Sequence, residues 1–456
     1  MNCVYCCIFN KEEYIKLLFL LLESIFIYGE LKDNIEILVY TSSEFMNLIK
    51  DSHLYDENKI KFQLNDNYTD VYSSCCSRLD FFEFENIDRY EKILYLDSDV
   101  LIKNDLNSVF DICEEQILYV LKEGTIEYIE PRCEDYWGHN LFTQEEINMY
   151  EDKSAFSSGI ILFKNCEEIK NLFQIIKEDI KIRRHSFIDQ PHIIYNAFKY
   201  NMYNNTLLQN FAHNNNLDIN SPYTIHHFPG VPGKSDLKLK KMNKFMFQLK
   251  NKTIENNIQE AKNFINTHLI QIIKDSNELL EGNIFMFHHT MKYTDKFIKK
   301  TKNISNLVLN KNINHIMEIG FNAGFSTLLM LISNPNLHIT CFDLGEHSYT
   351  IPCYEKIKEF YGDRLDLIIG DSTKTLPLHN DTYQLIHIDG GHTTEVATSD
   401  IENSLRLSTN KTILIMDDYD FPNLHKLWDS YIINKNLKKL DIFVYNSPHH
   451  DIKYII

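Results

Sequence analysis

The chain has 456 residues, of which 44% are hydrophobic and 24% are charged, and this is the composition of a globular protein. Its length favours two domains, because single hydrophobic cores rarely grow beyond roughly 250–300 residues. The formal net charge of −18 argues against a protein that binds nucleic acid through its phosphates, although a nucleotide bridged by a metal ion is compatible with it.

The cysteines and the apolar segments indicate the compartment. The ten cysteines are dispersed, and their spacing matches neither a zinc site nor a disulfide framework, so reduced thiols in the cytoplasm are expected. The apolar run at residues 17–27 is interrupted by Glu23 and is shorter than the ~20 residues that a membrane-spanning helix needs. It also lacks the basic start and the cleavage site of a signal peptide. We therefore expect a soluble protein whose first helix is buried.

The first half of the chain alternates between strand and helix patterns. Strands are expected at residues 2–9, 35–40, 60–64, 93–96, 117–122 and 156–164, and helices at 11–28, 44–50, 77–84 and 166–183. Such alternation predicts βαβ units and a largely parallel sheet.

Two carboxylates, Asp97 and Asp99, follow the expected strand at residues 93–96. On an extended backbone this spacing points both side chains to the same side, just beyond the carboxyl end of a strand, where open α/β sheets bind ligands. Carboxylate oxygens suit a hard divalent cation at such a place. Asp-x-Asp alone is also compatible with an acidic turn that ends the strand, so its neighbours must decide.

Four motifs in order carry a resemblance over roughly residues 1–250. They are YLDSDVLIKNDLNSVF (95–110), FSSGIILFK (156–164), DQ (189–190) and HHFPGVPGK (226–234). Together they resemble the glycogenin-like retaining glycosyltransferases of the GT-A fold, glycosyltransferase family 8. The resemblance implies a nucleotide sugar, with UDP as the expected nucleotide, and a divalent metal ion, Mn²⁺ or Mg²⁺.

The resemblance also assigns residues. The implied metal ligands are Asp97, Asp99 and His227, and the implied nucleotide-sugar-binding residues are Tyr14, Arg78, Asp97, Ser98, Ser157, Gly159, Gly230 and Lys234. Asp189 is expected near the anomeric carbon and Gln190 beside the sugar, both as catalytic candidates. The chemistry agrees, because a cation together with a lysine stabilises the charge that develops on a departing diphosphate. The alternatives are a structural loop histidine at His227 and a solvated lysine at Lys234.

Two positions depart from the family pattern. Ser157 stands where the family usually has Asn, so the sugar contact of that position is open. The loop is one residue longer before Lys234, so the motif does not decide which basic residue meets the phosphate.

A basic segment joins the two halves. Seven lysines alternate with apolar residues over 234–252. The pattern allows weak contact with an anionic membrane surface, and it favours a helix that packs on the first domain with its lysines in water. Polar helical sequence follows, and we place a linker at 251–284.

The second half opens with a strand at residues 315–319, a turn that contains Gly320 and Gly324, and a helix. The spacing is Gly-x-x-x-Gly and differs from the Gly-x-Gly-x-x-Gly of dinucleotide binders. Further strands are expected to end at Asp343, Asp371, Asp389 and Asp417. Residues 441–445 and 452–456 are expected to form a terminal hairpin.

This pattern, with the IDGGH motif at residues 388–392, resembles the class I S-adenosylmethionine-dependent methyltransferases over roughly 285–456, and small-molecule O-methyltransferases in particular. The implied cofactor is S-adenosylmethionine, held by Glu318, Gly320, Gly324, Ser326, Asp343, Asp371, Ser372 and Asp389. In metal-dependent members acidic strand ends bind Mg²⁺, which would assign Asp389, Asp417 and Asp418 as ligands. His392 would then accept a proton. The alternatives are an ordinary tight turn at the glycines and a structural partner of Asp389 at His392.

The sequence therefore predicts two doubly wound α/β domains in a bifunctional enzyme: a GT-A domain at 1–250, a helical linker at 251–284 and a Rossmann-like methyltransferase domain at 285–456. Both are expected to act on one glycan or glycoprotein acceptor. One alternative is that one domain is a catalytically spent nucleotide- or cofactor-binding scaffold. Another is glycogenin-like self-glycosylation on one of the 26 tyrosines. Nucleic acid is not expected as a partner, and a homodimer is left open.

Overall fold

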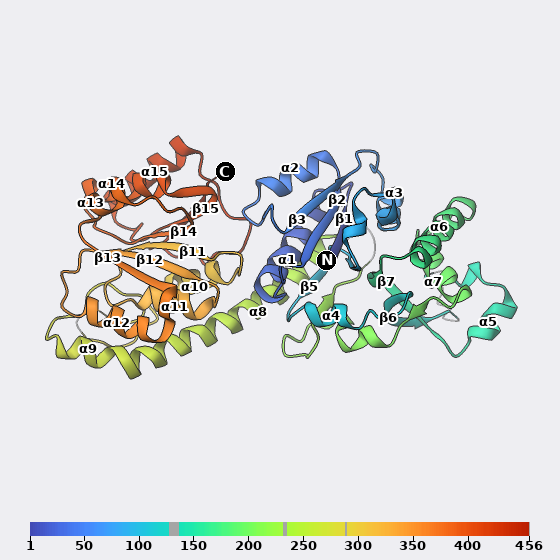
Figure 1. Cartoon of the computed structure of the whole chain (residues 1–456), viewed down its shortest axis with the longest axis horizontal. Coiled ribbons are helices and arrows are strands. Elements are labelled where there is room, and N and C mark those ends of the chain that lie inside the picture. Colours follow the sequence, from blue (N-terminus) through green and yellow to red (C-terminus); the bar gives the residue numbers. More distant parts are fainter. Residues whose placement is uncertain (127–135, 231–234, 288–289, 456) are drawn as a thin grey trace. The chain divides into compact units, whose positions relative to one another are not determined.

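The structure, a computed structural model, describes residues 1–126, 136–230, 235–287 and 290–455. It divides into two units (Figure 1). Unit 1 comprises residues 1–50 and 54–246, and unit 2 comprises residues 51–53 and 247–456. Each unit contains a β-sheet whose strands alternate with helices along the chain, which confirms the predicted α/β fold class. Residues 251–284, the expected linker, lie within unit 2.

Unit 1 is built on a seven-stranded sheet in the order β3-β2-β1-β4-β7-β6-β8. Its strands are β1 (Asn2–Ile8), β2 (Ile35–Thr41), β3 (Ile60–Leu64), β4 (Lys92–Leu96), β6 (Leu118–Thr125), β7 (Ser154–Lys164) and β8 (Tyr203–Asn204). Strands β1 to β4 run parallel, whereas β7 is antiparallel to both β4 and β6. A small second sheet contains β5 (Val100–Ile102), β9 (Ala212–Asn214) and β10 (Ile225–His227).

The helices of unit 1 lie between these strands along the chain. They are α1 (Glu13–Tyr28), α2 (Ser43–Asp51), α3 (Val71–Cys76), α4 (Asn107–Asp111), α5 (Gln144–Tyr150), α6 (Glu167–Ile182) and α7 (Gln190–Lys199). The apolar run at residues 17–27 lies in α1, where nearly all of its side chains are buried, as predicted. Among the described residues, no helix combines the length and the apolar character that crossing a membrane requires.

From Ser235 onward, the basic segment forms the first part of α8 (Ser235–Phe264). Met242, Phe245 and Met246 are buried there, and the ring of Phe245 packs against His226 and Phe228 at centroid distances of 4.5 and 5.6 Å. The start of α8 is therefore a packed amphipathic helix, which is the alternative that the sequence pattern favours.

Unit 2 has a six-stranded sheet in the order β13-β12-β11-β14-β15-β16. Its strands are β11 (His315–Ile319), β12 (His338–Asp343), β13 (Leu365–Ile369), β14 (Tyr383–Ile388), β15 (Ser408–Met416) and β16 (Asp451–Tyr454). Strands β11 to β15 are parallel, and β16 pairs antiparallel with β15. The strand order reverses between β11 and β14, and open α/β sheets bind ligands at the carboxyl ends of the strands beside such a point.

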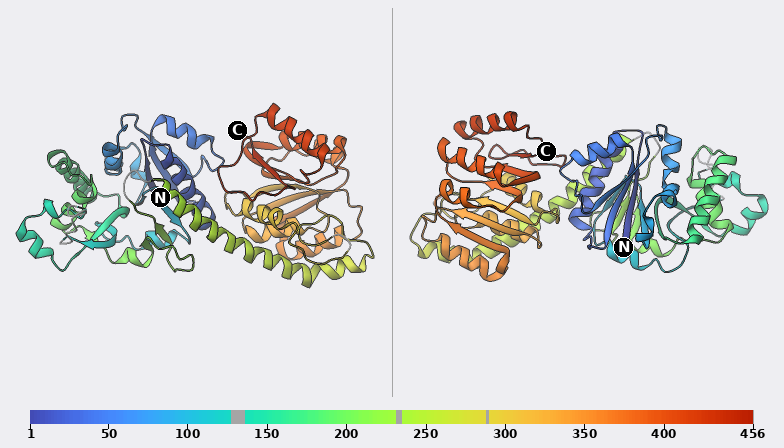
Figure 2. Two further views of the ribbon diagram at one scale, coloured as in Figure 1. Left: turned by 180° about the vertical axis from the view of Figure 1, so that it is seen from behind. Right: turned by 45° about the horizontal axis from the view of Figure 1, so that its top comes forward.

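Helices cover both faces of this sheet. They are α9 (Ile270–Asp275), α10 (Ile298–Val308), α11 (Phe325–Ser333), α12 (Thr350–Tyr361), α13 (Ser372–Thr375), α14 (Thr394–Arg406) and α15 (Pro422–Lys435). Helices α10 to α12 lie on one face, and α13 to α15 lie on the other (Figure 1). The two further views show the same three layers within unit 2 (Figure 2). This is the doubly wound arrangement that the alternating pattern predicts.

The predicted terminal hairpin is wrong. Residues 441–445 form no strand, and β16 alone adds to the sheet edge. The cause lies in two asparagines of α10. Asn303 Nδ2 donates to the carbonyl of Tyr445 at 2.9 Å, and Asn303 Oδ1 accepts from the N–H of Tyr445 at 2.8 Å. Asn306 Nδ2 donates to the carbonyl of Phe443 at 2.9 Å. These bonds take the backbone groups that a strand would need.

Asn303→Ala is expected to lower the free energy of unfolding of unit 2 by about 2 kcal/mol, because it leaves a partly buried N–H and a partly buried carbonyl without partners. Urea unfolding of the full chain, followed by circular dichroism, measures the change. Asn306→Ala is the matched comparison, since it removes one backbone bond in the same helix and should cost less. Equal losses in the two variants would contradict this account of the segment.

Candidate active sites

Three elements of unit 1 bring the predicted metal ligands together. Asp97 follows the end of β4, Asp99 precedes β5, and His227 ends β10, which is paired with β5. One ligand atom from each of the three side chains lies within 4.8 Å of the other two. His227 Nε2 is 3.4 Å from Asp99 Oδ1. Asp99 and His227 are buried, at 3% exposure each.

The orientation of His227 is set by a relay of two further residues. His227 Nδ1 lies 2.7 Å from Asn214 Oδ1, and Asn214 Nδ2 donates to Glu123 on β6. A carboxylate only accepts hydrogen bonds, so the amide nitrogen of Asn214 must face Glu123 and its oxygen must face the imidazole. Nδ1 of His227 therefore carries the proton, and Nε2 presents a lone pair to the carboxylates.

Gly159 closes the third side of this site. A Cβ atom at Gly159 would lie 2.4 Å from His227 Cε1, 2.6 Å from His227 Nε2 and 3.0 Å from Asp97 Oδ2. The carbonyl of Gly159 also accepts from the N–H of Asp97 at 2.8 Å. The backbone of β7 thus approaches the ligand atoms so closely that only glycine fits.

Arg78 connects the site to the predicted catalytic pair. Its Nε lies 2.8 Å from Asp189 Oδ2, and its Nη1 lies 3.4 Å from Asp97 Oδ1 and donates to the carbonyl of Ser158 at 2.5 Å. Burial raises the pKa of Asp189, and the guanidinium of Arg78 opposes that rise. Gln190 Oε1 accepts from the N–H of Ser158 at 3.1 Å. Arg78 therefore links Asp97 to Asp189. Ser158 of β7 contacts both Arg78 and Gln190 and so links Gln190 to the same group.

Lys238 is the basic residue that the sequence reasoning missed. The predicted Lys234 lies outside the described residues. Four positions later, Lys238 Nζ donates to Asp99 Oδ2 at 2.5 Å, and its stem passes Gly230, where a Cβ would be 3.2 Å from Lys238 Cε. In the sequence, Lys238 is distinguished only by its place in the basic segment, four residues after Lys234.

The remaining predicted residues of unit 1 lie around this centre. Burial raises the pKa of Tyr14, which is near enough to Lys238 to be affected by its charge. Ser157 is buried on β7, and its Oγ accepts from the N–H of Gly159 at 3.4 Å. Ser98 lies between the two carboxylates along the chain and is partly buried. No described contact joins Ser98 or Tyr14 directly to the ligand atoms.

These residues fit a divalent cation. Lys238 holds only Oδ2 of Asp99, and the other oxygen faces His227 Nε2. The imidazole is fixed with its lone pair toward the carboxylates, and the glycine at position 159 leaves the necessary space. The two carboxylates suit Mn²⁺ and Mg²⁺, and the imidazole favours the transition metal Mn²⁺ of the two.

In unit 2 the predicted cofactor turn is formed by two constrained glycines. Gly320 has φ +96°, and a Cβ there would lie 2.1 Å from the carbonyl oxygen of Asp389. Gly324 has φ +74° and caps the start of α11. Asp343 Oδ2 accepts from the backbone N–H groups of the two residues after Gly320, both at 2.8 Å. The carboxylate at the end of β12 thus braces the turn.

The other residues predicted to hold the cofactor lie near the same ends of the strands. Ser326 is buried in the first turn of α11. Asp371 caps α13 by accepting from the hydroxyl and the N–H of Thr373. These bonds, together with the ion pair to Lys374, lower the pKa of Asp371 to about 2. Ser372 is the first residue of α13. These side chains follow the ends of two strands, β11 and β13.

Glu318 is placed differently. It is fully buried on β11, where Thr327 donates to its Oε2 and His387 Nδ1 lies 2.9 Å from its Oε1. His387 Nε2 lies 3.2 Å from Asp417 Oδ2. Burial would lower the pKa of His387, but the two carboxylates raise it to about 10. Glu318 is therefore fully buried, and it is connected through His387 to Asp417. Its carboxylate oxygens are not exposed at the glycine turn.

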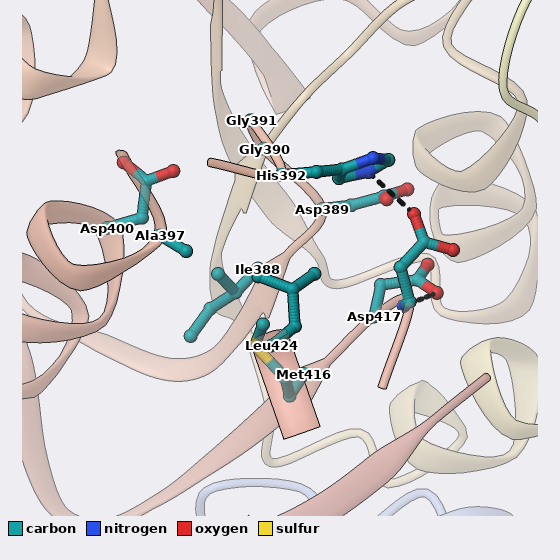
Figure 3. A pocket seen from close by; sticks show the side chains of 11 residues that line it. Ile388, Asp389, Gly390, Gly391, His392, Ala397, Asp400, Met416, Asp417 and Leu424 are labelled. Carbon is teal, nitrogen blue, oxygen red and sulfur yellow. Dashed lines mark hydrogen bonds and ion pairs between the residues drawn. The ribbon is translucent and has the colours of Figure 1, made fainter. Parts of the chain in front are cut away.

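A small pocket lies at the carboxyl ends of β14 and β15. Asp389, His392 and Asp417 line one side of it, and Asp400 lies on the other side (Figure 3). His392 Nε2 is 2.8 Å from Asp418 Oδ2, and this bond raises the pKa of His392. The structure therefore brings together the four residues predicted for proton transfer and metal binding: Asp389, His392, Asp417 and Asp418.

Lys300 on α10 joins this cluster, and the sequence reasoning missed it. Its Nζ forms an ion pair with Asp417 Oδ2 and lies 4.0 Å from Asp389 Oδ2. Only 8% of its side chain is exposed. Nothing in the lysine-rich sequence around position 300 distinguishes it from its neighbours.

Comparisons with known proteins assign each unit separately. The model of the glycosyl transferase family 8 matches residues 22–235, and the model of a methyltransferase domain matches residues 317–419. No curated protein matches the chain.

Three solved structures are similar in part. They are the bifunctional glycosyltransferase WbbM (16% identity, 55% of this chain and 51% of that chain, TM-score 0.39), a protein from Staphylococcus aureus provisionally described as a caffeoyl-CoA O-methyltransferase (15%, 43% and 99%, 0.31) and mouse xyloside xylosyltransferase 1 (11%, 51% and 99%, 0.34). The chain thus spans about half the length of the WbbM chain. All three TM-scores are too low to bear on function.

Proposed function

Because the chain carries a glycosyltransferase family 8 domain followed by a methyltransferase domain, we propose that it is a bifunctional enzyme of glycan synthesis. Unit 1 transfers a sugar from a UDP sugar with retention of configuration, and unit 2 transfers a methyl group from S-adenosylmethionine to a hydroxyl. The observation that supports this most is the convergence of Asp97, Asp99 and His227 around Gly159, because side chains beside three separate strands come together in an arrangement that fits a cation.

In unit 1, Asp97, Asp99 and His227 would hold Mn²⁺ or Mg²⁺. A bound ion supplies positive charge to a departing diphosphate. Lys238 places a second positive charge beside Asp99, where it can bind the same diphosphate. Arg78 keeps Asp189 at a fixed place beside Asp97, which is where the donor sugar is proposed to lie.

In unit 2, the turn at Gly320 and Gly324 and the N-terminus of α11 are proposed to receive S-adenosylmethionine. The cofactor supplies a methyl group on a positively charged sulfur. His392, held by Asp418, is proposed to accept the proton of the acceptor hydroxyl, and the raised pKa of His392 favours that transfer. Asp343 keeps the turn in place.

A screen of nucleotide sugars for Mn²⁺-dependent hydrolysis by the full chain tests the first activity. We expect release of free sugar from at least one UDP sugar, and no release in the absence of the metal. Donor binding without turnover on any acceptor would support the scaffold alternative instead.

Both units are proposed to act on one glycan, because tethering two enzymes raises the effective concentration of a shared intermediate. Incubation of the full chain with donor, S-adenosylmethionine and a glycan acceptor should give a product that carries both the sugar and a methyl group. Methylation of protein or nucleic acid alone would exclude the shared glycan.

Asn214→Ala is expected to weaken Mn²⁺ binding about 10- to 100-fold, because His227 loses the partner that fixes its proton on Nδ1. Electron paramagnetic resonance of free Mn²⁺ during titration measures the affinity. Asn148→Ala, at an exposed position of α5, is the control and should leave the affinity unchanged. An unchanged affinity in Asn214→Ala would show that the relay does not orient the imidazole.

A further inference from the structure

The carboxylate cluster of unit 2 already contains a cation from the chain itself. Asp389, Asp417 and Asp418 have ligand atoms within 4.8 Å of one another, which is the arrangement expected of a Mg²⁺ site. The ammonium of Lys300 lies in the same place, in an ion pair with Asp417 Oδ2 and 4.0 Å from Asp389 Oδ2. Lys300 reaches this position from α10, which precedes β11 in the chain. The two acidic strand ends, at Asp389 and Asp417, come after β11.

The oxygens of Asp417 are engaged. In addition to Lys300, its Oδ2 lies 3.2 Å from His387 Nε2 and 3.4 Å from His450 Nε2, so three nitrogens surround one oxygen. Its Oδ1 accepts from the N–H of Asp418 at 2.6 Å. A divalent ion at Asp417 would have to displace Lys300 and would lie beside the displaced charge.

The site in unit 1 differs in these respects. There Lys238 holds one oxygen of Asp99, the other oxygen faces a histidine lone pair, and a glycine leaves room beside both. The lysine of unit 1 is 19% exposed and has a proposed ligand of its own in the diphosphate. Lys300 is 8% exposed, and its ion pairs with described residues are those with the carboxylates.

We propose that Lys300 is the resident cation of the unit 2 cluster, and that the proposed methyl transfer takes place there without a divalent ion. Lys300 keeps Asp389 and Asp417 together at the end of the sheet, and its ammonium provides the positive charge near the acceptor oxygen. It is a positioning residue for the acceptor site. This inference rests on the methyltransferase function proposed above.

The test counts bound Mn²⁺ ions on the full chain by electron paramagnetic resonance. Wild-type protein should bind one ion, at the site of unit 1. Lys300→Met, which keeps the length of the side chain but removes its charge, should bind a second ion, and adding Asp389→Asn should remove that ion again. Lys300→Arg keeps the charge and should bind one ion. This variant remains available as a test if the methionine variant fails to fold.

Chelation supplies a second readout. Removal of divalent ions with EDTA should stop sugar release and leave the binding of S-adenosylhomocysteine and methyl transfer unchanged. Two ions on the wild-type protein, one of them lost in Asp389→Asn, would overturn the inference, as would a folded Lys300→Met protein that binds only one. Failure of the proposed function is distinguishable, because the wild-type protein would then not bind S-adenosylhomocysteine at all.

Discussion

Replacing Asp97 by asparagine is expected to lower Mn²⁺-dependent turnover of the nucleotide sugar by about 10³-fold. The substitution removes one of the three side chains that form the proposed cation site. It also removes the negative charge that Arg78 and the hydroxyl of Tyr95 contact, at 3.4 and 2.6 Å. Steady-state hydrolysis of the donor, measured at saturating Mn²⁺, gives the change.

Two controls make this result specific. Asp111→Asn changes an exposed aspartate of α4 in the same unit and should leave turnover unchanged. The binding of S-adenosylhomocysteine to Asp97→Asn should equal that of the wild type, because the substitution lies in the other unit. Turnover within a few-fold of wild type in Asp97→Asn would refute the metal assignment.

Gly320→Ala is expected to lower methyl transfer by about 10²-fold, because the cofactor turn must move away from its present place. The added Cβ would lie 2.1 Å from the carbonyl oxygen of Asp389, which is backbone and cannot rotate aside. The left-handed backbone at φ +96° adds strain of roughly 1–3 kcal/mol. The thermal shift that S-adenosylhomocysteine produces should be lost in the variant.

Gly362→Ala is the matched control for this prediction. Gly362 also has a positive φ, +57°, but a Cβ there would have no neighbour within 4 Å. It should therefore lose roughly 1–3 kcal/mol of stability through backbone strain alone and keep the full thermal shift with the ligand. If both alanine variants kept the shift, the turn at Gly320 would not be the cofactor site.

The parts of the structure that follow from local pattern were predictable. The strands that precede Asp97 and Gly320 are short apolar runs, and they form where expected, as β4 and β11. The i, i+2 carboxylates and the glycine turn are also local signals, since the residues of each motif lie on one strand end.

The residues that the sequence did not reveal come from distant elements. Lys238 and Lys300 are lysines among several others, and only the packing of α8 and α10 decides that these two point toward carboxylates. Asn214 is one of many asparagines, and its role depends on the pairing of β9 with β10. The terminal hairpin failed for a related reason, since Asn303 of α10 takes the backbone groups of Tyr445.

Calorimetry of the full chain with two ligands tests the central claim of two separate transferase sites most directly. UDP should bind with a stoichiometry of one in the presence of Mn²⁺ and should not bind after chelation. S-adenosylhomocysteine should bind with a stoichiometry of one under both conditions, and neither ligand should affect the other. Absence of binding for either ligand, or competition between the two for one site, would contradict the account.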